Sequence, residues 1–336
     1  MSRVFVTGAT GFIGGHLVRA LVEADHKVTC LVRKTSNRSA LEPLGVDFHV
    51  GDINSVDSLA DPIADVDMVF HLAAMLKAPW RSDFLSTNAD GARNVAAACA
   101  RADKPPTLVA VSSLAAAGPS KHGRPRTEDT TPAPVSKYGR SKLNGEVAVR
   151  EFADRVPSTI IRPPMVFGQG DTASLPLFKV VNRGWHLTPT RTSSRVAMIH
   201  VQDLAQSLVA AAENGERLPS NGDRSPGKGI YFIAHNQQPS MLELGHLIAS
   251  AMGQQRLRVV RAPSLVTKLV GTVGEVVGRV TDKPSMFNYD KTREATAGNW
   301  LCSTAKARDQ LQFKPGALLQ QRLDETAAWY RDNNWV

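Results

Sequence analysis

The sequence predicts an α/β fold with a doubly wound parallel sheet and a smaller C-terminal α/β part. Short apolar, β-branched runs alternate with helical patterns over the first half of the chain, as is typical of right-handed βαβ units. A glycine-rich turn joins the first of these strands to the first helix. The chain has 336 residues, 42% of them hydrophobic and 21% charged, which is enough to bury a large core.

The expected elements of the first half follow one another regularly. Each strand is a run rich in β-branched residues, and each helix has apolar residues at helical spacing. Strands are expected over residues 3–9, 27–33, 46–52, 66–74, 107–113 and 158–164, and helices over 14–26, 88–102 and the stretch that contains Tyr138 and Lys142.

The pattern loosens after residue 168. Residues 168–194 are rich in turn formers and suit a substrate-facing insertion. Residues 197–215 look like a strand and a helix that return to the main sheet, and a smaller α/β segment follows. In that segment Ser240 and Glu243 have the spacing of a capping box. The expected domains are a nucleotide-binding domain of residues 1–170, joined by 199–216, and a substrate-binding part of 171–198 and 230–336.

Composition excludes several classes of function. The net charge is +9, but the 40 Lys and Arg residues are scattered, so an anionic cofactor is expected and nucleic acid is not. No apolar run reaches the roughly 18–20 residues of a membrane span, and the N-terminus enters a strand without an export signal. Cys30, Cys99 and Cys302 form no CxxC pair. A reduced, cytoplasmic protein without a zinc or other metal site is therefore expected.

The stretch "VFVTGATGFIGGHL" predicts a dinucleotide site of the Rossmann type. Its glycines follow a strand and open a helix, so the backbone can turn tightly and approach a pyrophosphate, which the helix N-terminus binds through free amides. The expected contacts are Gly8, Gly11, Phe12, Ile13 and Gly14.

The end of the second strand favours NADP(H) over NAD. An NAD enzyme usually has an acid there, against the ribose 2′-hydroxyl, but this chain has "CLVRKTSNRSA". The Arg33 guanidinium suits a 2′-phosphate, with Arg38 or Ser36 assisting and Lys34 as a substitute for Arg38. The alternative is a solvated basic loop.

Tyr138 and Lys142 lie four residues apart in "VSKYGRSKLNGE", so they share one face of a helix. A free phenol has a pKa near 10 and is a poor catalyst at neutral pH. An ammonium one turn away lowers that pKa. Ser113 ends an upstream strand, and open α/β sheets bind ligands at the carboxyl ends of their strands. Its hydroxyl could donate a hydrogen bond to a carbonyl oxygen; the alternative is a loop cap.

Together these motifs resemble the extended short-chain dehydrogenase/reductases, a group that contains dihydroflavonol reductases, 3β-hydroxysteroid dehydrogenases and sugar-nucleotide epimerases and dehydratases. The similar motifs occur in the family's order and cover roughly residues 3–210. They are "TGATGFIG", "GDI" (51–53), "HLAA" (71–74), "SSLAAAG" (112–118), "YGRSK" (138–142), "RPPMVFG" (162–168) and "IHVQDLA" (199–205).

The resemblance implies roles for further residues. It places Asp52 and Ile53 at the adenine and Asn88 in support of the site. The residues Leu72, Ala73, Ala74, Pro163 and Val166 would line the path of the cofactor to the nicotinamide. Ser113, Tyr138 and Lys142 would be the catalytic set, with Lys142 also binding the nicotinamide ribose.

Three hypotheses of function follow. The first is an NADPH-dependent carbonyl reductase, or the reverse alcohol dehydrogenase, in which Tyr138 is the general acid and base. The second is a sugar-nucleotide epimerase or dehydratase with a retained NAD, whose diphosphate Arg183, Arg191 and Arg195 would bind. The third is a nucleotide-sensing protein, a class that typically loses the tyrosine or the lysine. Arg33 favours the first hypothesis.

The second half adds hints about the substrate. Residues 262–284 have apolar residues at helical spacing, with Lys268, Glu275 and Arg279 as the charges before the end. This helix would cover an apolar pocket, lie on a membrane surface, or pack on its own domain. An apolar pocket would suit a steroid-, flavonoid- or acyl-like ketone. The net positive charge of the protein would suit a carboxylate group on that substrate. Trp185 and His186 would touch substrate or pack under the loop. The helices after Asn88 and Tyr138 would pair two subunits, as in resembling proteins.

Overall fold

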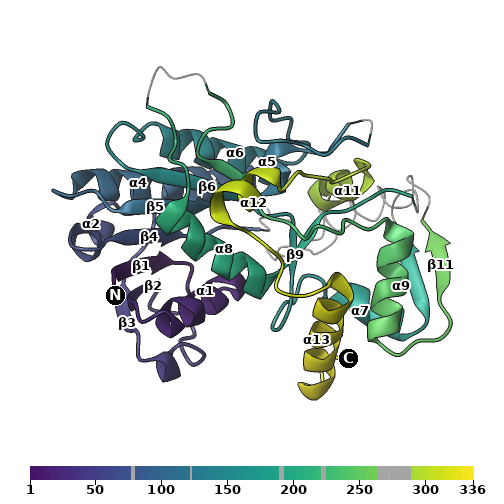
Figure 1. Ribbon diagram of the computed structural model, residues 1–336. Coiled ribbons are helices and arrows are strands. Elements are labelled where there is room, and N and C mark those ends of the chain that lie inside the picture. The colour runs from purple at the N-terminus through teal and green to yellow at the C-terminus, as the bar shows by residue number, and fades with distance from the viewer. Residues whose placement is uncertain (77–79, 122, 189–192, 221–224, 263–271, 273–288) are drawn as a thin grey trace.

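The structure is a computed structural model of the chain. It describes residues 1–336 except 77–79, 122, 189–192, 221–224, 263–271 and 273–288. The described part contains a large sheet covered by helices and, beside it, a smaller group of helices with a short two-stranded sheet (Figure 1). This arrangement confirms the predicted doubly wound α/β fold.

Seven parallel strands form the main sheet in the order β10-β6-β5-β4-β1-β2-β3. From β1 the chain builds the sheet in one direction through β2 and β3, and it then returns to add β4, β5 and β6 on the other side of β1. In chain order the strands are β1 (Arg3–Thr7), β2 (Lys27–Val32), β3 (Asp47–Val50), β4 (Met68–His71), β5 (Thr107–Val111), β6 (Ser158–Arg162) and β10 (Ile230–Phe232). Because all of them run parallel, the residues that follow each strand meet at one edge of the sheet.

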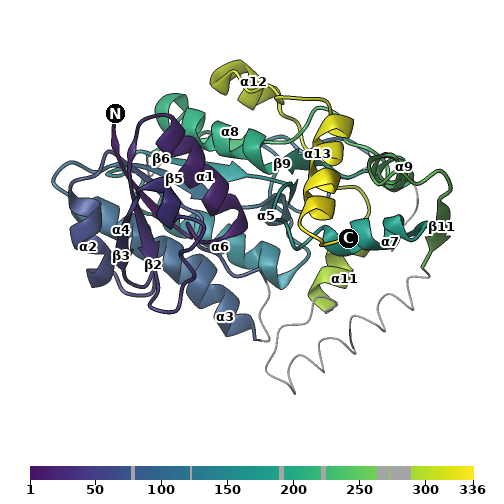
Figure 2. The ribbon, with the colours of Figure 1, turned by 90° about the horizontal axis from the view of Figure 1, so that it is seen from below.

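Helices cover both faces of this sheet (Figure 2). Helices α1 (Phe12–Glu23) and α8 (Val201–Asn214) lie on one face, with α12 (Ala305–Leu311) beside α8. On the other face lie α2 (Asp57–Ala64), α4 (Gly91–Arg101) and α6 (Lys137–Arg150). Short elements complete this part: η1 (Glu42–Leu44), α3 (Arg81–Leu85), the π-helical η2 (Ser86–Asp90) and α5 (Leu114–Ala117).

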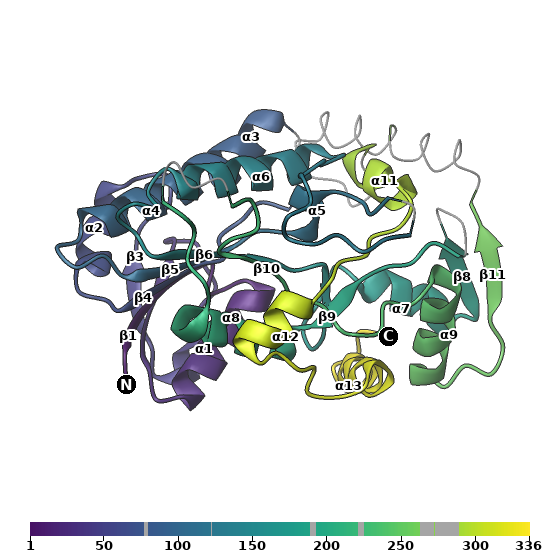
Figure 3. The ribbon, with the colours of Figure 1, turned by 45° about the horizontal axis from the view of Figure 1, so that its top comes forward.

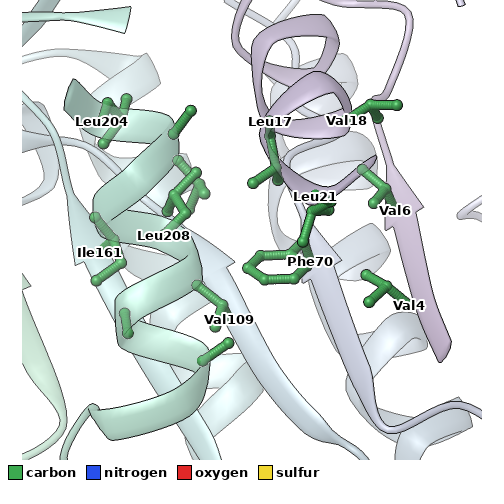
Figure 4. Close-up of a cluster of buried hydrophobic side chains, with 14 of the residues drawn as sticks. Val4, Val6, Leu17, Val18, Leu21, Phe70, Val109, Ile161, Leu204 and Leu208 are labelled. Atoms are coloured by element: carbon green, nitrogen blue, oxygen red, sulfur yellow. The ribbon is translucent and has the colours of Figure 1, made fainter. Parts of the chain in front are cut away.

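The core between the sheet and α1 and α8 is apolar (Figure 4). Leu17 and Leu21 of α1, and Leu204 and Leu208 of α8, are fully buried with Phe70 of β4. Each such side chain contributes roughly 1.5–3 kcal/mol through its transfer from water. Both faces of the sheet are covered, which explains why its central strands β1, β4 and β5 are nearly continuous apolar runs.

The second group of elements surrounds its own apolar cluster. It contains α7 (Leu175–Asn182), β8 (Trp185–Thr188), α9 (Met241–Ala251), β11 (Arg258–Arg261) and α13 (Leu319–Asp332). Phe178, Leu244, Ile248, Leu323 and Tyr330 are buried together in this cluster. Helix α11 (Tyr289–Thr296) lies between this group and α6 (Figure 3).

Two strands differ from the expected organisation. Residues 230–232, assigned from the sequence to the substrate-binding part, form the edge strand β10 of the main sheet, in register with β6. The strand expected to return to the main sheet with α8 is β9 (Met198–His200), and it pairs instead with β7 (Met165–Phe167). Only the helix returns, by packing against α1. Short buried strands carry little information about their partners, because apolar runs of this length suit either sheet.

Candidate active site

The glycine loop joins β1 to α1 at the carboxyl edge of the sheet. Gly8 has φ +75, and a Cβ there would lie 2.6 Å from the Ala73 backbone nitrogen. A Cβ on Gly14 would lie 2.1 Å from the Gly8 carbonyl oxygen, so only glycine fits at either position. At the exposed Gly11 a Cβ would meet only the Gly8 oxygen, at 3.2 Å.

The N-terminus of α1 fits an anion. Its N-cap, Gly11, provides no side-chain cap, and the first turn, which begins with Phe12 and Ile13, contains no acid. The first backbone N–H groups of a helix lack intrahelical partners and carry the positive end of the helix dipole. The loop and the helix end therefore fit the pyrophosphate of a dinucleotide.

The basic loop after β2 lies at the same edge. Arg33 is exposed, and its backbone N–H donates to the Ser36 hydroxyl over 3.0 Å. The Arg38 guanidinium stacks over the Phe48 ring, 5.4 Å from its centre. No Asp or Glu occurs from residue 33 to residue 41. These contacts shape the loop and leave the Arg33 side chain at the surface.

The loops after β3 and β4 continue the edge. Asp52 Oδ1 accepts hydrogen bonds from the backbone and side chain of Asn54, at 2.9 and 3.1 Å, which forms a turn. Ile53 is buried with the core of the α2–α4 face. After β4, the Leu72 and Ala73 backbone N–H groups donate to the Thr7 carbonyl and hydroxyl, at 3.1 and 3.3 Å. The neighbouring Ala74 is exposed.

Ser113 and Tyr138 are brought together at the end of β5. Ser113 is the N-cap of α5, where its hydroxyl accepts from the Ala115 N–H at 3.1 Å, and it is also hydrogen-bonded to the Tyr138 hydroxyl. The Tyr138 side chain is buried with Phe84 and Ala115, and Met75 packs against them. Burial raises the pKa of Tyr138, and the hydrogen bond with Ser113 opposes that rise.

Lys142 lies one turn after Tyr138 and is buried. Burial lowers the pKa of Lys142 to about 8, and the nearby Glu146 carboxylate opposes this change. Burial, together with the charge of Lys142, lowers the pKa of His71 to about 3, so that imidazole is neutral. Its Nδ1 is hydrogen-bonded to the Thr7 hydroxyl over 2.8 Å.

A buried ion pair supports the helix that carries Lys142. Arg162, at the end of β6, donates to both carboxylate oxygens of Glu146, at 2.8 and 2.6 Å. The Ser112 hydroxyl donates to the same carboxylate at 2.5 Å. Glu146 is not among the residues predicted from the sequence, although its position one turn after Lys142 is a usable signal. This carboxylate connects β5, β6 and α6 directly behind the site.

Asn88 connects a loop of the site to the same helix. Its side-chain carbonyl accepts from the Met75 N–H at 2.7 Å, and its amide donates to the Met75 carbonyl at 3.0 Å. The amide also donates to the Ser141 hydroxyl at 2.9 Å. The buried Asn88 thus holds the segment after β4 against α6.

Helix α11 caps the first turn of α6. The Asp290 carboxylate accepts from the backbone N–H groups of Lys137 and Tyr138, at 2.6 and 3.0 Å. Glu294 accepts from the Ser136 hydroxyl at 2.6 Å. Lys291 Nζ lies 4.9 Å from the centre of the Tyr138 ring and 2.8 Å from Glu294. The charges of α11 give no local signal of a partner about 150 residues away, so no role for this helix could be predicted from the sequence.

Residues 4–225 match the model of the NAD-dependent epimerase/dehydratase family. The chain belongs to this family. It is an NAD(P)-dependent oxidoreductase of the extended short-chain dehydrogenase/reductase superfamily, as the motifs predicted. The loop after β1 and the helix α1 lie within the residues that match this family.

Similar curated family members include reductases and a dehydrogenase. The chain is 32% identical to the ceramide reductase of Caulobacter vibrioides over 99% of its length and 96% of the relative's. It is 27% identical to a farnesyl-dihydroquinoline-oxide ketoreductase of Stigmatella aurantiaca, over 96% and 95% of the two chains. It is also 27% identical to the 3 beta-hydroxysteroid dehydrogenase/Delta 5-->4-isomerase of Mycobacterium tuberculosis, over 98% and 90%.

Solved structures share the fold of this family member along its whole length. The crystal structure of gox2253 superposes with a TM-score of 0.78 at 24% identity, covering 99% of each chain. MoeE5 in complex with UDP-glucuronic acid and NAD superposes with a TM-score of 0.73 at 22% identity, covering 98% of this chain and 99% of MoeE5. At these identities the likeness shows the shared fold.

Several predicted substrate contacts lie away from Tyr138 or cannot be placed. His186 is buried against α9, where its Nε2 is hydrogen-bonded to the Met241 carbonyl at 2.8 Å, so it packs under the loop. Arg195 Nε donates to the Gln238 carbonyl at 2.9 Å, and Arg183 is exposed at the end of α7. Arg191 lies outside the described residues. So do Lys268, Glu275 and Arg279, with nearly all of 262–284.

Proposed function

We propose that this oxidoreductase is an NADPH-dependent carbonyl reductase for an apolar ketone or aldehyde, or the corresponding alcohol dehydrogenase in the reverse direction. The paired hydroxyl groups of Ser113 and Tyr138 at the carboxyl end of β5 carry the proposal. Two hydroxyls at one point can both donate to a single carbonyl oxygen, which is the arrangement that carbonyl reduction needs.

In the proposed mechanism, the nucleotide site would hold a reduced nicotinamide, which when bound would be the source of the hydride for the carbonyl carbon. Ser113 and Tyr138 donate hydrogen bonds to the carbonyl oxygen, and these bonds strengthen as negative charge develops on it. Tyr138 then transfers its phenolic proton to that oxygen and is left as a phenolate. In the reverse direction the phenolate accepts the proton of the alcohol.

Two cations support the proton transfer in this proposal. Lys142 is buried one turn away on the same helix, where it is also proposed to bind the nicotinamide ribose. Lys291 lies against the ring itself. Positive charge near a phenol stabilises the phenolate, and Lys291 lowers the pKa of Tyr138 in this way, whereas the proposed contribution of Lys142 is to hold the ribose.

Arg33 supports NADP(H) as the cofactor. It is an exposed guanidinium at the end of β2 with no acid in the following loop, and a guanidinium binds a 2′-phosphate through charge-assisted hydrogen bonds. A carboxylate at this position would have favoured the 2′-hydroxyl of NAD.

Apolar contacts at Tyr138 support an apolar substrate. Phe84, Ala115 and Met75 surround the phenol, and the Phe84 ring centre lies 6.4 Å from that of Tyr138. The relatives named above include a ceramide reductase and a hydroxysteroid dehydrogenase. We therefore propose that the substrate is a long-chain acyl-like or steroid-like ketone. The net positive charge of the protein is compatible with a carboxylate group on this substrate.

The first test is to purify the protein, denature it and identify the nucleotide released. An empty site or NADP(H), together with faster oxidation of NADPH than of NADH when a long-chain ketone is added, would support the proposal. One equivalent of retained NAD⁺ would contradict it and favour the sugar-nucleotide epimerase or dehydratase. A nucleotide that binds but is turned over with neither substrate class would favour a sensing protein.

Two further expectations stay predictions. A homodimer through the exposed faces of α4 and α6 is tested by the mass of the protein in solution. A cytoplasmic location is tested by fractionating cells that produce the chain. Among the described residues, no helix has the length and apolar character of a membrane span.

A further inference from the structure

The small sheet of β8 and β11 presents a mixed apolar and basic face to solvent. The two strands pair in parallel, with Trp185 opposite Arg258 and Leu187 opposite Val260. Side chains alternate across a strand, so these four residues share one side, called here the β8–β11 face. It lies at the end of the molecule far from the N-terminus in every view (Figures 1, 2 and 3).

One side of this sheet is packed and the other is open. His186 and Thr188, on the inner side of β8, are fully buried. On the outer side Trp185 is 41% exposed, Leu187 52% and Val260 40%. Single exposed apolar residues are common, but three on one small sheet form a patch, and such patches mark interaction sites.

Cations surround the apolar residues. The Arg258 guanidinium stacks on Trp185, 5.3 Å from the ring centre, and the Arg258 N–H donates to the Gly184 carbonyl at 2.8 Å, beside Arg183. The exposed cations in and next to the two strands are Lys179, Arg183, Arg256, Arg258 and Arg261. Residues 179–188 and 253–262 contain no Asp or Glu. The two strands and the residues next to them therefore carry charge of one sign.

We propose that the β8–β11 face docks on the surface of an anionic lipid bilayer. Tryptophan prefers the interface between water and lipid, because its ring is apolar and its N–H is polar. Leu187 and Val260 would enter the same layer, and the arginines would reach the lipid phosphates while their stems stay on apolar surface. This inference does not depend on the reaction proposed above.

Charge argues against a second copy of the chain as the occupant. In a symmetric dimer the same patch meets itself, and the cations of the two copies would then face one another. Like charges brought together across an interface oppose association. An anionic bilayer instead supplies the opposite charge over the whole patch.

The test is co-sedimentation with lipid vesicles. We expect the full chain to bind vesicles of equal parts phosphatidylcholine and phosphatidylglycerol, to bind phosphatidylcholine vesicles poorly, and to be released by high salt. The double variant Arg256→Gln/Arg258→Gln should bind roughly 25-fold more weakly, at roughly fivefold for each cation removed. The variant Trp185→Ala/Leu187→Ser should lose binding as well.

Matched variants elsewhere on the surface serve as controls. Val147→Ser removes an exposed apolar side chain from α6, and Lys104→Gln removes an exposed cation after α4; both should bind vesicles like the unchanged chain. Melting temperatures show that each variant is folded. The proposal would be overturned if Trp185→Ala/Leu187→Ser bound vesicles as tightly as the unchanged chain, or if binding did not depend on the charge of the lipid. So would a solution dimer that this variant dissociates, because the occupant would then be a second copy.

Discussion

Lys291 Nζ lies 4.9 Å from the centre of the Tyr138 ring, although the two residues are far apart in the sequence. They meet because Asp290 and Glu294 of the same helix bind the first turn of α6. Burial raises the pKa of Tyr138, Lys291 lowers it, and Glu294 raises it. The charge of Glu146, in turn, supports the protonated form of Lys142. A cation outside the Tyr-x-x-x-Lys pair therefore acts directly on the phenol.

Replacing Lys291 should change the pH dependence of the reaction. In Lys291→Met the pKa of Tyr138 should rise, because the charge that lowers it is gone. Alcohol oxidation needs the phenolate, so its acidic limb should move to higher pH. The measurement is kcat/KM against pH. Lys291→Arg should keep the original profile, and Arg140→Met, which removes an exposed cation of α6, the helix of Tyr138, should have no effect. An unchanged profile in Lys291→Met would contradict this role.

Removing the Tyr138 hydroxyl should stop proton transfer. We expect Tyr138→Phe to reduce turnover by about 10²–10⁴-fold, the usual contribution of a general acid, and Ser113→Ala to reduce it by about 10²–10³-fold. Both variants should still bind the nucleotide, which is measured by quenching of protein fluorescence. Turnover by Tyr138→Phe at a tenth of the original rate or more would show that another group supplies the proton.

Gly14 and Gly15 provide a matched pair in the nucleotide loop. A Cβ on Gly14 would lie 2.1 Å from the Gly8 carbonyl oxygen, whereas on Gly15 the nearest contact is 3.9 Å. Gly14→Ala should therefore lower the free energy of unfolding by about 1–3 kcal/mol and weaken nucleotide binding. Gly15→Ala should be neutral or stabilise the helix by up to about 1 kcal/mol. The measurements are urea denaturation and nucleotide titration. Equal effects would mean that the loop accommodates the methyl group.

Arg33 should decide the choice between the two cofactors. Arg33→Ala should weaken NADPH binding by roughly 10–100-fold, the loss expected for charge-assisted hydrogen bonds to a phosphate, and should leave NADH binding nearly unchanged. The measurement is the ratio of the two dissociation constants. Arg3→Ala removes another partly exposed arginine at the opposite end of β1 and should change neither constant. A proportional loss for both nucleotides in Arg33→Ala would place Arg33 away from the 2′-phosphate.

Breaking the buried pair behind the site should destabilise the fold. Glu146→Gln leaves the Arg162 guanidinium buried without its carboxylate, a change that costs about 3–5 kcal/mol. It should also lower the pKa of Lys142 further, because the Glu146 charge opposes the effect of burial. Glu151→Gln breaks a half-exposed pair with Arg93 and should cost at most about 1 kcal/mol. Denaturant unfolding compares the two variants, and similar losses would be inconsistent with a structural role for Glu146.

Local patterns predicted the first half of the chain well. The glycine loop, the basic end of β2 and the Tyr138–Lys142 spacing depend on residues within a few positions of one another, and helix and strand geometry converts such spacing directly into proximity. The parallel sheet with helices on both faces also followed from the βαβ pattern. Ser113 was predicted from its place at the end of a strand and Asn88 from the resemblance, and the structure connects both residues to α6.

Contacts between distant segments needed the tertiary structure. Sequence patterns alone were sufficient to predict the family, the doubly wound sheet and the candidate Tyr138–Lys142 pair. Only the folded chain decided that β10 joins the main sheet, that β9 pairs with β7, and that α11 places Lys291 at the Tyr138 ring. The sequence of a three-residue apolar strand does not indicate which strand it pairs with. Charged residues such as those of α11 indicate a role only when packing buries them beside another group. The periodicity of apolar residues predicts whether a segment is a helix or a strand, whereas the packing of the whole chain decides which segments lie next to it.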